Sequence, residues 1–394
     1  MSNPSSDSIA VYDILIVGAG PAGLSTALHL AQTAPHLIPR TLILEKARHP
    51  RPKLCGGGIL PDGEVILNRL GLDLSEIPHV DVSWAHFDFN TSGLVMRARD
   101  DAPYAFRCIQ RDEFDAWLAE HARRRGFTIH EDTNVQNLKI GEEYVEVATN
   151  RGPYRARVVV GADGSNSRVR RAIAPHDSSN VARLLEVYTP VNPESSAHRT
   201  TDSYFDFICI PDGVSGYVWD FPALVKGQPM RNRGVYDWNH LRRAGRKPLK
   251  HVLSQELRRH GQELDEYPPA GHPIRWFNAR GTFCAPRVIL VGDAAGVDPL
   301  YGEGISISLG YGRIAAEALR EAFEQGNFSF NGYRQRVLRD PLGIALRRRV
   351  FFSQIIYRIT SPVMQAFIWR KLGGVVKFLV QTFLIDWAKR QPSL

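Results

Sequence analysis

Changes in the hydrophobic period divide the chain into elements. A continuous apolar run over residues 14–17 leads into a helical pattern over residues 24–34, and similar short runs recur at residues 41–44, 156–160 and 288–291. Short continuous apolar runs are typical of strands that are buried on both faces, as in parallel sheets with helices on either side. The pattern therefore predicts an α/β fold.

Other segments alternate between apolar and polar positions, which is the pattern of half-buried strands. The clearest is residues 204–210, which a turn at residues 211–213 joins to an apolar return over residues 216–221, so the sequence predicts a β-hairpin there. Further strands are expected at residues 80–109, 128–130, 135–140, 144–148 and 154–160.

Three helices are expected besides the first. Arg111 opens one that ends near Gly126, with apolar residues at helical spacing between them. Residues 253–260 form a short basic helix, and a long one starts at Gly304 and ends near Gly326. Residues 268–273, between these last two helices, are expected to be a connection back to the cofactor domain.

The tail from about Asn331 differs in kind. Its apolar stretches, residues 350–357, 359–369 and 378–385, are interrupted by Arg and Lys, and none reaches the roughly 18 residues that a membrane span needs. Such a pattern fits helices that lie in a membrane interface or that close over a lipid pocket. It fits ordinary core helices with a basic outer side equally well.

Composition places the chain among ordinary globular proteins and adds a positive charge. Hydrophobic residues make up 43% and charged residues 23% of 394 positions, and the formal net charge is +8. That charge fits an anionic membrane as a partner and fits an ordinary solvated basic surface equally well, whereas nucleic acid is disfavoured because no binding motif accompanies the basic residues. Four scattered cysteines suggest neither a disulfide framework nor a metal site, so a reducing cytoplasm is expected. Residues Met1–Ile9 are expected to be a disordered tail.

The turn after the first strand has the chemistry of a dinucleotide cradle. Gly18, Gly20 and Gly23 follow the G-x-G-x-x-G spacing, in which glycines allow the tight turn, the approach of a pyrophosphate and close helix packing. The second strand ends in Glu45, roughly where an acid binds ribose hydroxyls.

Two later strands also run into turns that combine Gly and Asp. The first contains Asp163 in Gly-Ala-Asp-Gly-Ser-Asn-Ser-Arg, and the second contains Asp293 in Gly-Asp-Ala-Ala-Gly. Asp293 is expected to accept a hydrogen bond from a sugar or ribityl hydroxyl, while the amides of Gly304 and Ile305 at a helix start meet the ring and phosphate of the cofactor.

Taken in order, these motifs resemble FAD proteins of the para-hydroxybenzoate hydroxylase-like fold, over about residues 13–326. Two further segments are similar to signatures of the geranylgeranyl reductase family, which saturates prenyl chains. They are Pro52-Lys-Leu-Cys55-Gly-Gly-Gly58 and Tyr217-Val-Trp219-Asp-Phe221-Pro222. Ala223 departs from the polar residue expected after this proline, which leaves the lipid head group open.

The resemblance implies a Rossmann-type FAD-binding domain interleaved with an antiparallel-sheet substrate domain, plus a C-terminal helical region. The FAD-binding parts are residues 10–79, 111–179 and 278–330, the substrate-side parts are residues 80–110 and 180–277, and the helical region is residues 331–394. The expected FAD contacts are Gly18, Gly20, Ala22, Gly23, Glu45, Gly56, Gly58, Arg111, Val135, Asp163, Asp293, Pro299, Gly302, Gly304 and Ile305.

The implied reaction is hydride transfer from reduced FAD to a prenyl double bond, with a proton added at the neighbouring carbon. Cys55 is predicted to organise or supply that proton, and the faces of Tyr217 and Trp219 to stabilise transient positive charge. The expected substrate-binding residues are Tyr217, Trp219, Phe221 and Pro222. An inert packing role for Cys55, and a core role for the aromatic residues, are the alternatives.

Two other functions stay open at this point. An FAD-dependent monooxygenase or halogenase, acting through a flavin hydroperoxide, would share the FAD motifs, although halogenases carry a second Trp where this chain has Tyr217. The second of these other functions is that of a catalytically idle flavoprotein that anchors partners at a membrane. For the reductase, the expected partners are a prenylated lipid or prenyl diphosphate and an anionic membrane at the inner face, and the electron donor is NADPH or a small redox protein.

Overall fold

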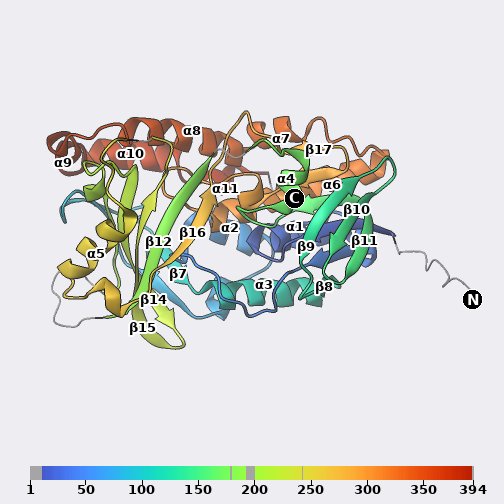
Figure 1. Cartoon of the computed structure of the whole chain (residues 1–394), viewed down its shortest axis with the longest axis horizontal. Coiled ribbons are helices and arrows are strands. Elements are labelled where there is room, and N and C mark those ends of the chain that lie inside the picture. Colours follow the sequence, from blue (N-terminus) through green and yellow to red (C-terminus); the bar gives the residue numbers. More distant parts are fainter. Residues whose placement is uncertain (1–10, 178–179, 192–199, 242, 393–394) are drawn as a thin grey trace, which may run out of the picture.

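Two large sheets lie side by side, and the C-terminal helices cover one side of both (Figure 1). The computed structural model describes residues 11–177, 180–191, 200–241 and 243–392. The tail predicted to be disordered, Met1–Ile9, lies outside these residues.

The first sheet is the predicted α/β unit. It has eight strands. Six of them follow the order β17-β18-β11-β1-β2-β8, and the other two, β10 and β9, branch from β11, with β10 paired to β11 and β9 paired to β10. Because β1 is parallel to β11, and β11 to β18, the three Gly-rich turns that follow these strands lie at the same edge. The bounds are β1 (Val11–Val17), β2 (Thr41–Leu44), β8 (Thr128–His130), β9 (Val135–Ile140), β10 (Val145–Thr149), β11 (Gly152–Gly161), β17 (Cys284–Ala285) and β18 (Val288–Leu290).

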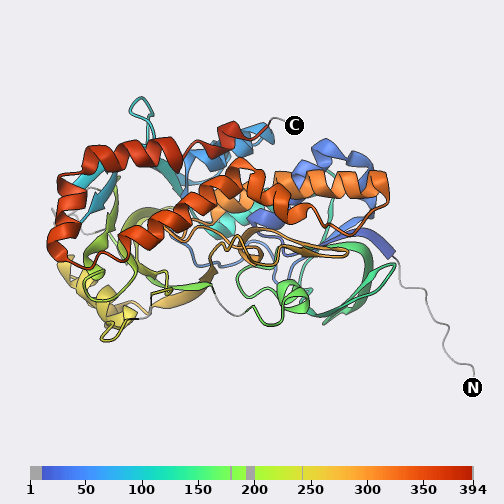
Figure 2. The same cartoon turned by 90° about the horizontal axis from the view of Figure 1, so that it is seen from above.

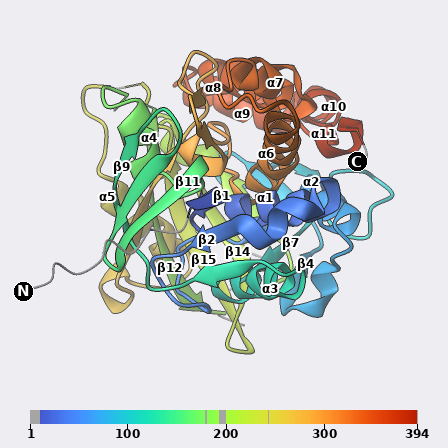
Figure 3. The same cartoon turned by 90° about the vertical axis from the view of Figure 1, so that its right-hand side faces the viewer.

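Helices α1 (Pro21–Thr33) and α6 (Ile305–Gln325) pack against each other beside this sheet. They approach closely because Gly312 has no side chain, and a Cβ there would lie 2.3 Å from Ser25 Oγ. Helix α3 (Arg111–Arg124) begins at the predicted residue, and α6 ends as predicted at Gly326, which has a φ of +65°. Figure 3 shows α6 between α1 and the C-terminal helices.

The second sheet has seven strands, in the order β16-β12-β15-β14-β13-β5-β6. Helix α5 (Leu249–Arg259) packs on one of its faces and starts four residues before the expected position. The strand bounds are β5 (Ala85–Asp88), β6 (Gly93–Met96), β12 (Val181–Pro190), β13 (Ser203–Asp206), β14 (Gly216–Val225), β15 (Gln228–Asp237) and β16 (Ala270–Arg275).

Smaller elements connect these layers. A three-stranded sheet is formed by β3 (Gly58–Ile59), β7 (Phe106–Ile109) and β4 (His79–Val82). Two short α-helices are α2 (Pro61–Arg69) and α4 (Arg168–Ile173). The 3₁₀ turns are η1 (Pro35–Arg40), η2 (Leu74–Glu76), η3 (Phe207–Cys209), η4 (Leu264–Glu266) and η5 (Gly292–Ala294).

Two expectations for the second sheet were wrong in part. The predicted strand over residues 204–210 ends at Asp206, whose carboxylate accepts a hydrogen bond from the Ile208 amide and so starts a 3₁₀ turn. Residues 268–273, predicted to be only a connection between domains, mostly belong to strand β16, which pairs with β12. Pro273 is tolerated because β16 is an edge strand, where a missing amide donor leaves no unpaired neighbour.

The C-terminal helices run around one end of the second sheet and return to the first (Figure 2). They are α7 (Tyr333–Arg339), α8 (Pro341–Ile356), α9 (Pro362–Arg370), α10 (Gly373–Phe383) and α11 (Trp387–Arg390). Trp387 packs over Gly310 of α6, and Arg349 pairs with Asp298 at 2.9 Å. None of the helices in the described part of the chain is both long enough and apolar enough to cross a bilayer.

Candidate active site

A cavity of about 590 Å³ lies where the two sheets meet. It starts at the Gly-rich turns of the first sheet, passes the loop that contains Cys55, continues along β14 and ends at α10. Motifs that are far apart in the sequence therefore line one continuous space. All but three of the predicted site residues border it, the exceptions being Gly23, Pro299 and Pro222.

The first turn is shaped so that only glycine fits. A Cβ on Gly18, which has a φ of +106°, would lie 2.4 Å from the Ala162 carbonyl oxygen, and one on Gly23 would lie 2.0 Å from the Gly18 oxygen. Gly20 faces the cavity, and the guanidinium groups of Arg51 and Arg111 lie 3.7 and 4.0 Å from the position of its missing Cβ. The buried Asp115 carboxylate pairs with both guanidinium groups, with Arg111 at 2.9 Å and with Arg51 at 3.3 Å, and so holds them beside the glycine turn. The amides of such a turn fit a pyrophosphate.

Carboxylates surround this cradle. Glu45 Oε2 accepts a hydrogen bond from the Ala19 amide at 2.8 Å, which fixes the acid at the end of β2. Asp293 Oδ2 accepts one from Ser165 Oγ at 2.7 Å. Gly304 and Ile305 line the same wall at the start of α6. The residues present thus match what FAD requires: glycine turns, cations for phosphates, acids for hydroxyls and a helix N-terminus.

Asp163 has a structural task as well. Its Oδ2 accepts hydrogen bonds from the amides of Arg168 at 2.6 Å and Val169 at 3.2 Å, so it caps α4. Val135, the first residue of β9, also borders the cavity. The FAD contacts expected of both residues remain predictions.

The loop that carries Cys55 is fixed from two sides. The Cys55 amide donates to Glu186 Oε1 at 2.9 Å, and the Tyr188 hydroxyl donates to the Cys55 carbonyl at 3.5 Å. Gly57 has a φ of +77°, and a Cβ there would lie 2.2 Å from the Ile109 carbonyl oxygen. Strand β12 and Gly57 therefore set the position of the Cys55 thiol.

Burial raises the pKa of the Cys55 thiol, and the nearby Arg111 guanidinium and the Gly57 amide offset part of that rise. The thiol is therefore protonated at neutral pH. A protonated thiol can donate a proton, whereas the thiolate of a nucleophilic cysteine cannot.

Aromatic side chains form the next wall. Tyr217, Trp219 and Phe221 alternate along β14 and face the cavity together. The Trp219 indole lies over Gly234, where a Cβ would come within 2.2 Å of it, and its Nε1 donates to Asn232 Oδ1 at 2.6 Å. The Tyr217 hydroxyl donates to the Tyr301 carbonyl, so Tyr217 offers its ring to the cavity.

The three predicted residues outside the cavity have identifiable positions. Gly23 packs on Gly18, as expected of the third glycine, and the Pro299 carbonyl accepts a hydrogen bond from the Tyr236 hydroxyl at 2.9 Å. Pro222 was expected to contact substrate, but it alternates with Phe221 and so belongs to the other face of β14.

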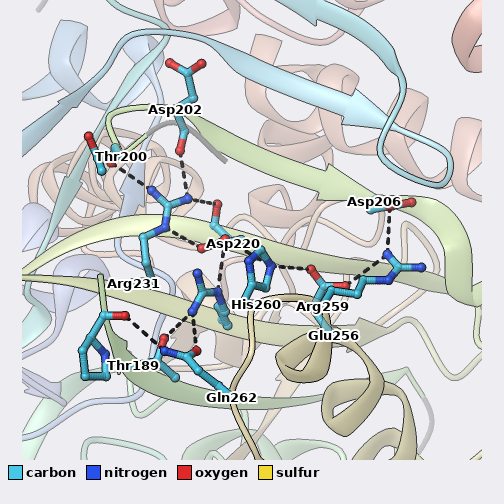
Figure 4. Close-up of polar contacts among 12 residues, drawn as sticks. Thr189, Thr200, Asp202, Asp206, Asp220, Arg231, Glu256, Arg259, His260 and Gln262 are labelled. Carbon is cyan, nitrogen blue, oxygen red and sulfur yellow. Dashed lines mark hydrogen bonds and ion pairs between the residues drawn. The ribbon is translucent and has the colours of Figure 1, made fainter. Parts of the chain in front are cut away.

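A layer of polar side chains lies on the face of β14 opposite the aromatic wall, and Figure 4 shows the contacts within this layer. Asp220, between Trp219 and Phe221 on β14 but on the opposite face, pairs with Arg231 at 2.6 Å and with Arg233 at 3.1 Å. All three side chains are nearly inaccessible to solvent. Because buried ion pairs are costly to separate, this layer holds β14 in place.

Sequence reasoning missed several polar residues around the cavity. Burial raises the pKa of Glu186 to about 7, although the Cys55 amide opposes the shift. Lys53 Nζ lies 2.5 Å from His272 Nε2; burial lowers the pKa of Lys53 to about 8, and burial together with Lys53 lowers that of His272 to about 4. Lys53 stands beside Cys55 in a recognised motif, but no local pattern marks Glu186 or His272.

The fold and the cavity together define a flavoprotein of the FAD-dependent oxidoreductase class. The family described as "FAD binding domain" matches residues 11–322. Digeranylgeranylglycerophospholipid reductase 2 of Methanopyrus kandleri is 30% identical over 343 residues, covering 81% of this chain and 79% of that protein. The corresponding reductase of Methanosarcina acetivorans is 29% identical, covering 81% and 77%. The chain belongs to the geranylgeranyl reductase family of FAD-dependent oxidoreductases, and it binds FAD.

Solved structures share the same fold. A geranylgeranyl bacteriochlorophyll reductase-like protein from Thermoplasma acidophilum has a TM-score of 0.76 at 22% identity, covering 96% of this chain and 95% of that one. A flavin-dependent halogenase has a TM-score of 0.65 at 21% identity, covering 97% and 72%. The predicted architecture is thereby confirmed.

Proposed function

We propose that this chain reduces carbon–carbon double bonds of a geranylgeranyl or related prenyl chain carried by a lipid. The observation that carries the proposal is the order of groups along one cavity: the glycine turns, then Cys55, then an aromatic wall that ends at the apolar side of α10. A long hydrocarbon chain can lie against such a wall with one double bond beside Cys55.

Bound FAD, once reduced, supplies the hydride. The residues around it have three tasks. Arg51 and Arg111 neutralise the pyrophosphate, the Cys55 thiol provides the proton, and the aromatic wall excludes water. An isolated double bond has no carbonyl group to polarise it, so positive charge develops on one carbon, and the faces of Tyr217 and Trp219 stabilise it by about 2 kcal/mol in a dry site.

The substrate class also suggests where the enzyme works and which partners it needs. A prenylated lipid or prenyl diphosphate is the substrate, and the enzyme works in lipid biosynthesis on the cytoplasmic side of an anionic membrane, which it contacts peripherally. All four cysteines are free, as in a reducing compartment. NADPH or a small redox protein supplies the electrons.

An anaerobic single turnover tests the reaction. The bound flavin is reduced chemically, a geranylgeranyl lipid is added, and flavin reoxidation and product mass are followed. We expect reoxidation without air and a mass gain of two hydrogens per double bond. Reoxidation only in air, with oxygen or halogen in the product, would instead show a monooxygenase or halogenase.

A further inference from the structure

The last helices carry an unusual distribution of charge. Residues 341–385 contain no Asp or Glu and seven Arg or Lys, of which only Arg349 is buried in an ion pair. The other six are Arg347, Arg348, Arg358, Arg370, Lys371 and Lys377. A positive surface of this size is complementary to an anionic bilayer.

The same helices carry most of the exposed apolar side chains. In the described part of the chain, eight of the eleven exposed large apolar residues lie between residues 351 and 378. The most exposed are Val363 of α9 at 77%, Phe378 of α10 at 61% and Phe351 of α8 at 58%. We call the surface formed by Phe351, Ile355, Val363, Met364, Phe367, Leu372, Val375 and Phe378 the apolar face.

Basic residues flank the apolar positions of α8 and α9. On α8, Arg347 precedes Phe351 by one helical turn, and Lys371, the residue that directly follows α9, comes four residues after Phe367. Long basic side chains in such places can reach lipid phosphates while the apolar residues between them enter the acyl region.

Helix α10 separates this face from the cavity. Val375 and Phe378 point outward, whereas Val380, Leu384 and Ile385, on and just after α10, line the cavity. Across the cavity end from α10 lie Arg97 and Ala98, which follow β6. A prenyl chain that crossed between α10 and the segment 93–102 would pass directly from the apolar face to the aromatic wall.

The contacts that hold α10 to this segment are weak. Lys377 Nζ lies 2.6 Å from Asp100 Oδ1, whose side chain is 75% exposed, and Gln381 Nε2 donates to the Ala98 carbonyl at 3.2 Å. Exposed ion pairs contribute about 1 kcal/mol at most. Of the eleven residues of α10, only Val380 is buried. Elements with so little burial open at low free-energy cost.

We infer that the apolar face docks on an anionic bilayer and that the prenyl chain enters the cavity between α10 and residues 93–102. This inference rests on the proposed function for the identity of the chain that enters. It assigns the membrane as the partner, the apolar face as the contact and α10 as the wall that moves.

Flotation with vesicles tests the docking surface. Wild type is expected to float with vesicles of phosphatidylcholine and phosphatidylglycerol, and weakly with phosphatidylcholine alone. Phe367→Asp/Phe378→Asp should reduce flotation at least tenfold, whereas Val11→Asp/Ile140→Asp, the matched control at exposed apolar sites on the first sheet, should not. Equal flotation of both variants would overturn the docking surface. The docking surface would also be overturned if wild type is a dimer and the Phe367→Asp/Phe378→Asp variant becomes a monomer that floats as well as wild type. The apolar face would then be the contact between two copies of the chain.

A disulfide across the passage tests the route. A Cβ on Gly373, at the start of α10, would lie 3.5 Å from Leu94 Cβ on β6, which is within the range that a disulfide spans. Oxidised Gly373→Cys/Leu94→Cys should still float with vesicles. Its cavity, however, should be labelled at least tenfold more slowly by a diazirine-tagged geranylgeranyl chain presented in those vesicles, and reductant should restore labelling.

Wild type and Gly373→Cys under the same oxidant serve as controls. Labelling of the oxidised double variant at the wild-type rate would overturn the route. Photolabelling needs no flavin reduction, so the two proposals can fail separately. Normal labelling of wild type without a hydrogenated product would reject the reductase function and leave the route intact.

Discussion

At the scale of single residues, the site depends on how the protein environment changes ordinary side chains. Cys55 stays protonated because it is buried, and its position is set by Glu186 through the Cys55 amide. Glu186 is itself a carboxyl whose pKa is raised by burial. Neither property can be derived from the residue type alone.

Replacing Cys55 with Ser should slow the anaerobic single turnover by at least 100-fold, because a hydroxyl is a much weaker acid than a thiol and general acids contribute this much. Flavin content should not change. The matched control is Cys284→Ser, because the Cys284 thiol donates to the Phe330 carbonyl and lies away from the cavity. A Cys55→Ser protein with wild-type turnover would show that Cys55 only packs.

Glu186→Gln should stabilise the protein more at pH 8 than at pH 5. The folded-state pKa of about 7 lies above the ordinary value of 4.5, so the folded chain holds its proton more tightly, and stability is lost as pH rises from about 4.5 to 7. Gln removes this loss, which is on the order of 1–3 kcal/mol. Thermal unfolding at both pH values measures it.

Glu120→Gln, at a half-exposed carboxylate of α3, controls for the change of net charge. If the gain in unfolding temperature is the same at pH 5 and pH 8, the Glu186 carboxyl is already ionised at the lower pH and the argument from burial is wrong.

At the scale of elements, strand β14 combines two faces with opposite chemistry. Its cavity face is aromatic, and its other face carries Asp220 in the buried ion pairs with Arg231 and Arg233. Alternation along a strand makes this arrangement readable from the sequence. The same rule places Pro222 on the face of β14 that points away from the cavity. The sequence therefore already indicated that Pro222 does not share a face with Tyr217, Trp219 and Phe221.

Gly234→Ala should disturb the wall and the strand beside it. The added methyl group would lie 2.2 Å from the Trp219 indole and 2.5 Å from the Leu185 carbonyl oxygen of β12, so the strand must shift locally and the ring must turn away and lose its hydrogen bond to Asn232. We expect turnover to fall at least tenfold with flavin content retained, and the Trp219 fluorescence to change. Gly332→Ala is the control, because a Cβ there meets nothing within 4 Å. Unchanged turnover would mean that the indole position is unimportant.

At the scale of the whole molecule, the C-terminal helices are part of the core as well as a surface. Arg349 is buried against Asp298 and Glu303, and Trp387 packs on α6. Arg349 and Glu303 also line the cavity. The sequence left open whether these helices face a membrane or form a pocket wall. The two expectations are compatible, because one side of α10 lines the cavity and another side is exposed.

Deleting residues 347–394 should therefore prevent folding. Loss of Arg349 alone leaves two buried carboxyl groups without a cation, which costs about 3–5 kcal/mol. We expect the truncated chain to be insoluble or to lack cooperative unfolding, whereas Arg347→Ala, an exposed change in the same helix, should unfold like wild type. A truncated protein that unfolds cooperatively and retains flavin would contradict this role.

The sequence by itself determined the features that depend on local rules. The glycines at residues 18, 20 and 23, the apolar strands before them and the alternation of β14 follow from backbone sterics and from the periods of strands and helices. These rules predicted an α/β fold and a dinucleotide cradle, and the resemblance of the motifs to those of flavoproteins added the full fold class and FAD, which the comparisons confirmed.

Only the tertiary structure decided the contacts between segments that are distant in the chain. Residues 270–275 become a strand because they pair with residues 181–186 of β12, which lie 84 to 94 positions earlier in the chain. Glu186 and His272 have shifted pKa values because they are buried beside Cys55 and Lys53. The cavity likewise reaches α10 only because the last helices return across the second sheet. Burial and long-range pairing are properties of the packed chain, so no local pattern could reveal them.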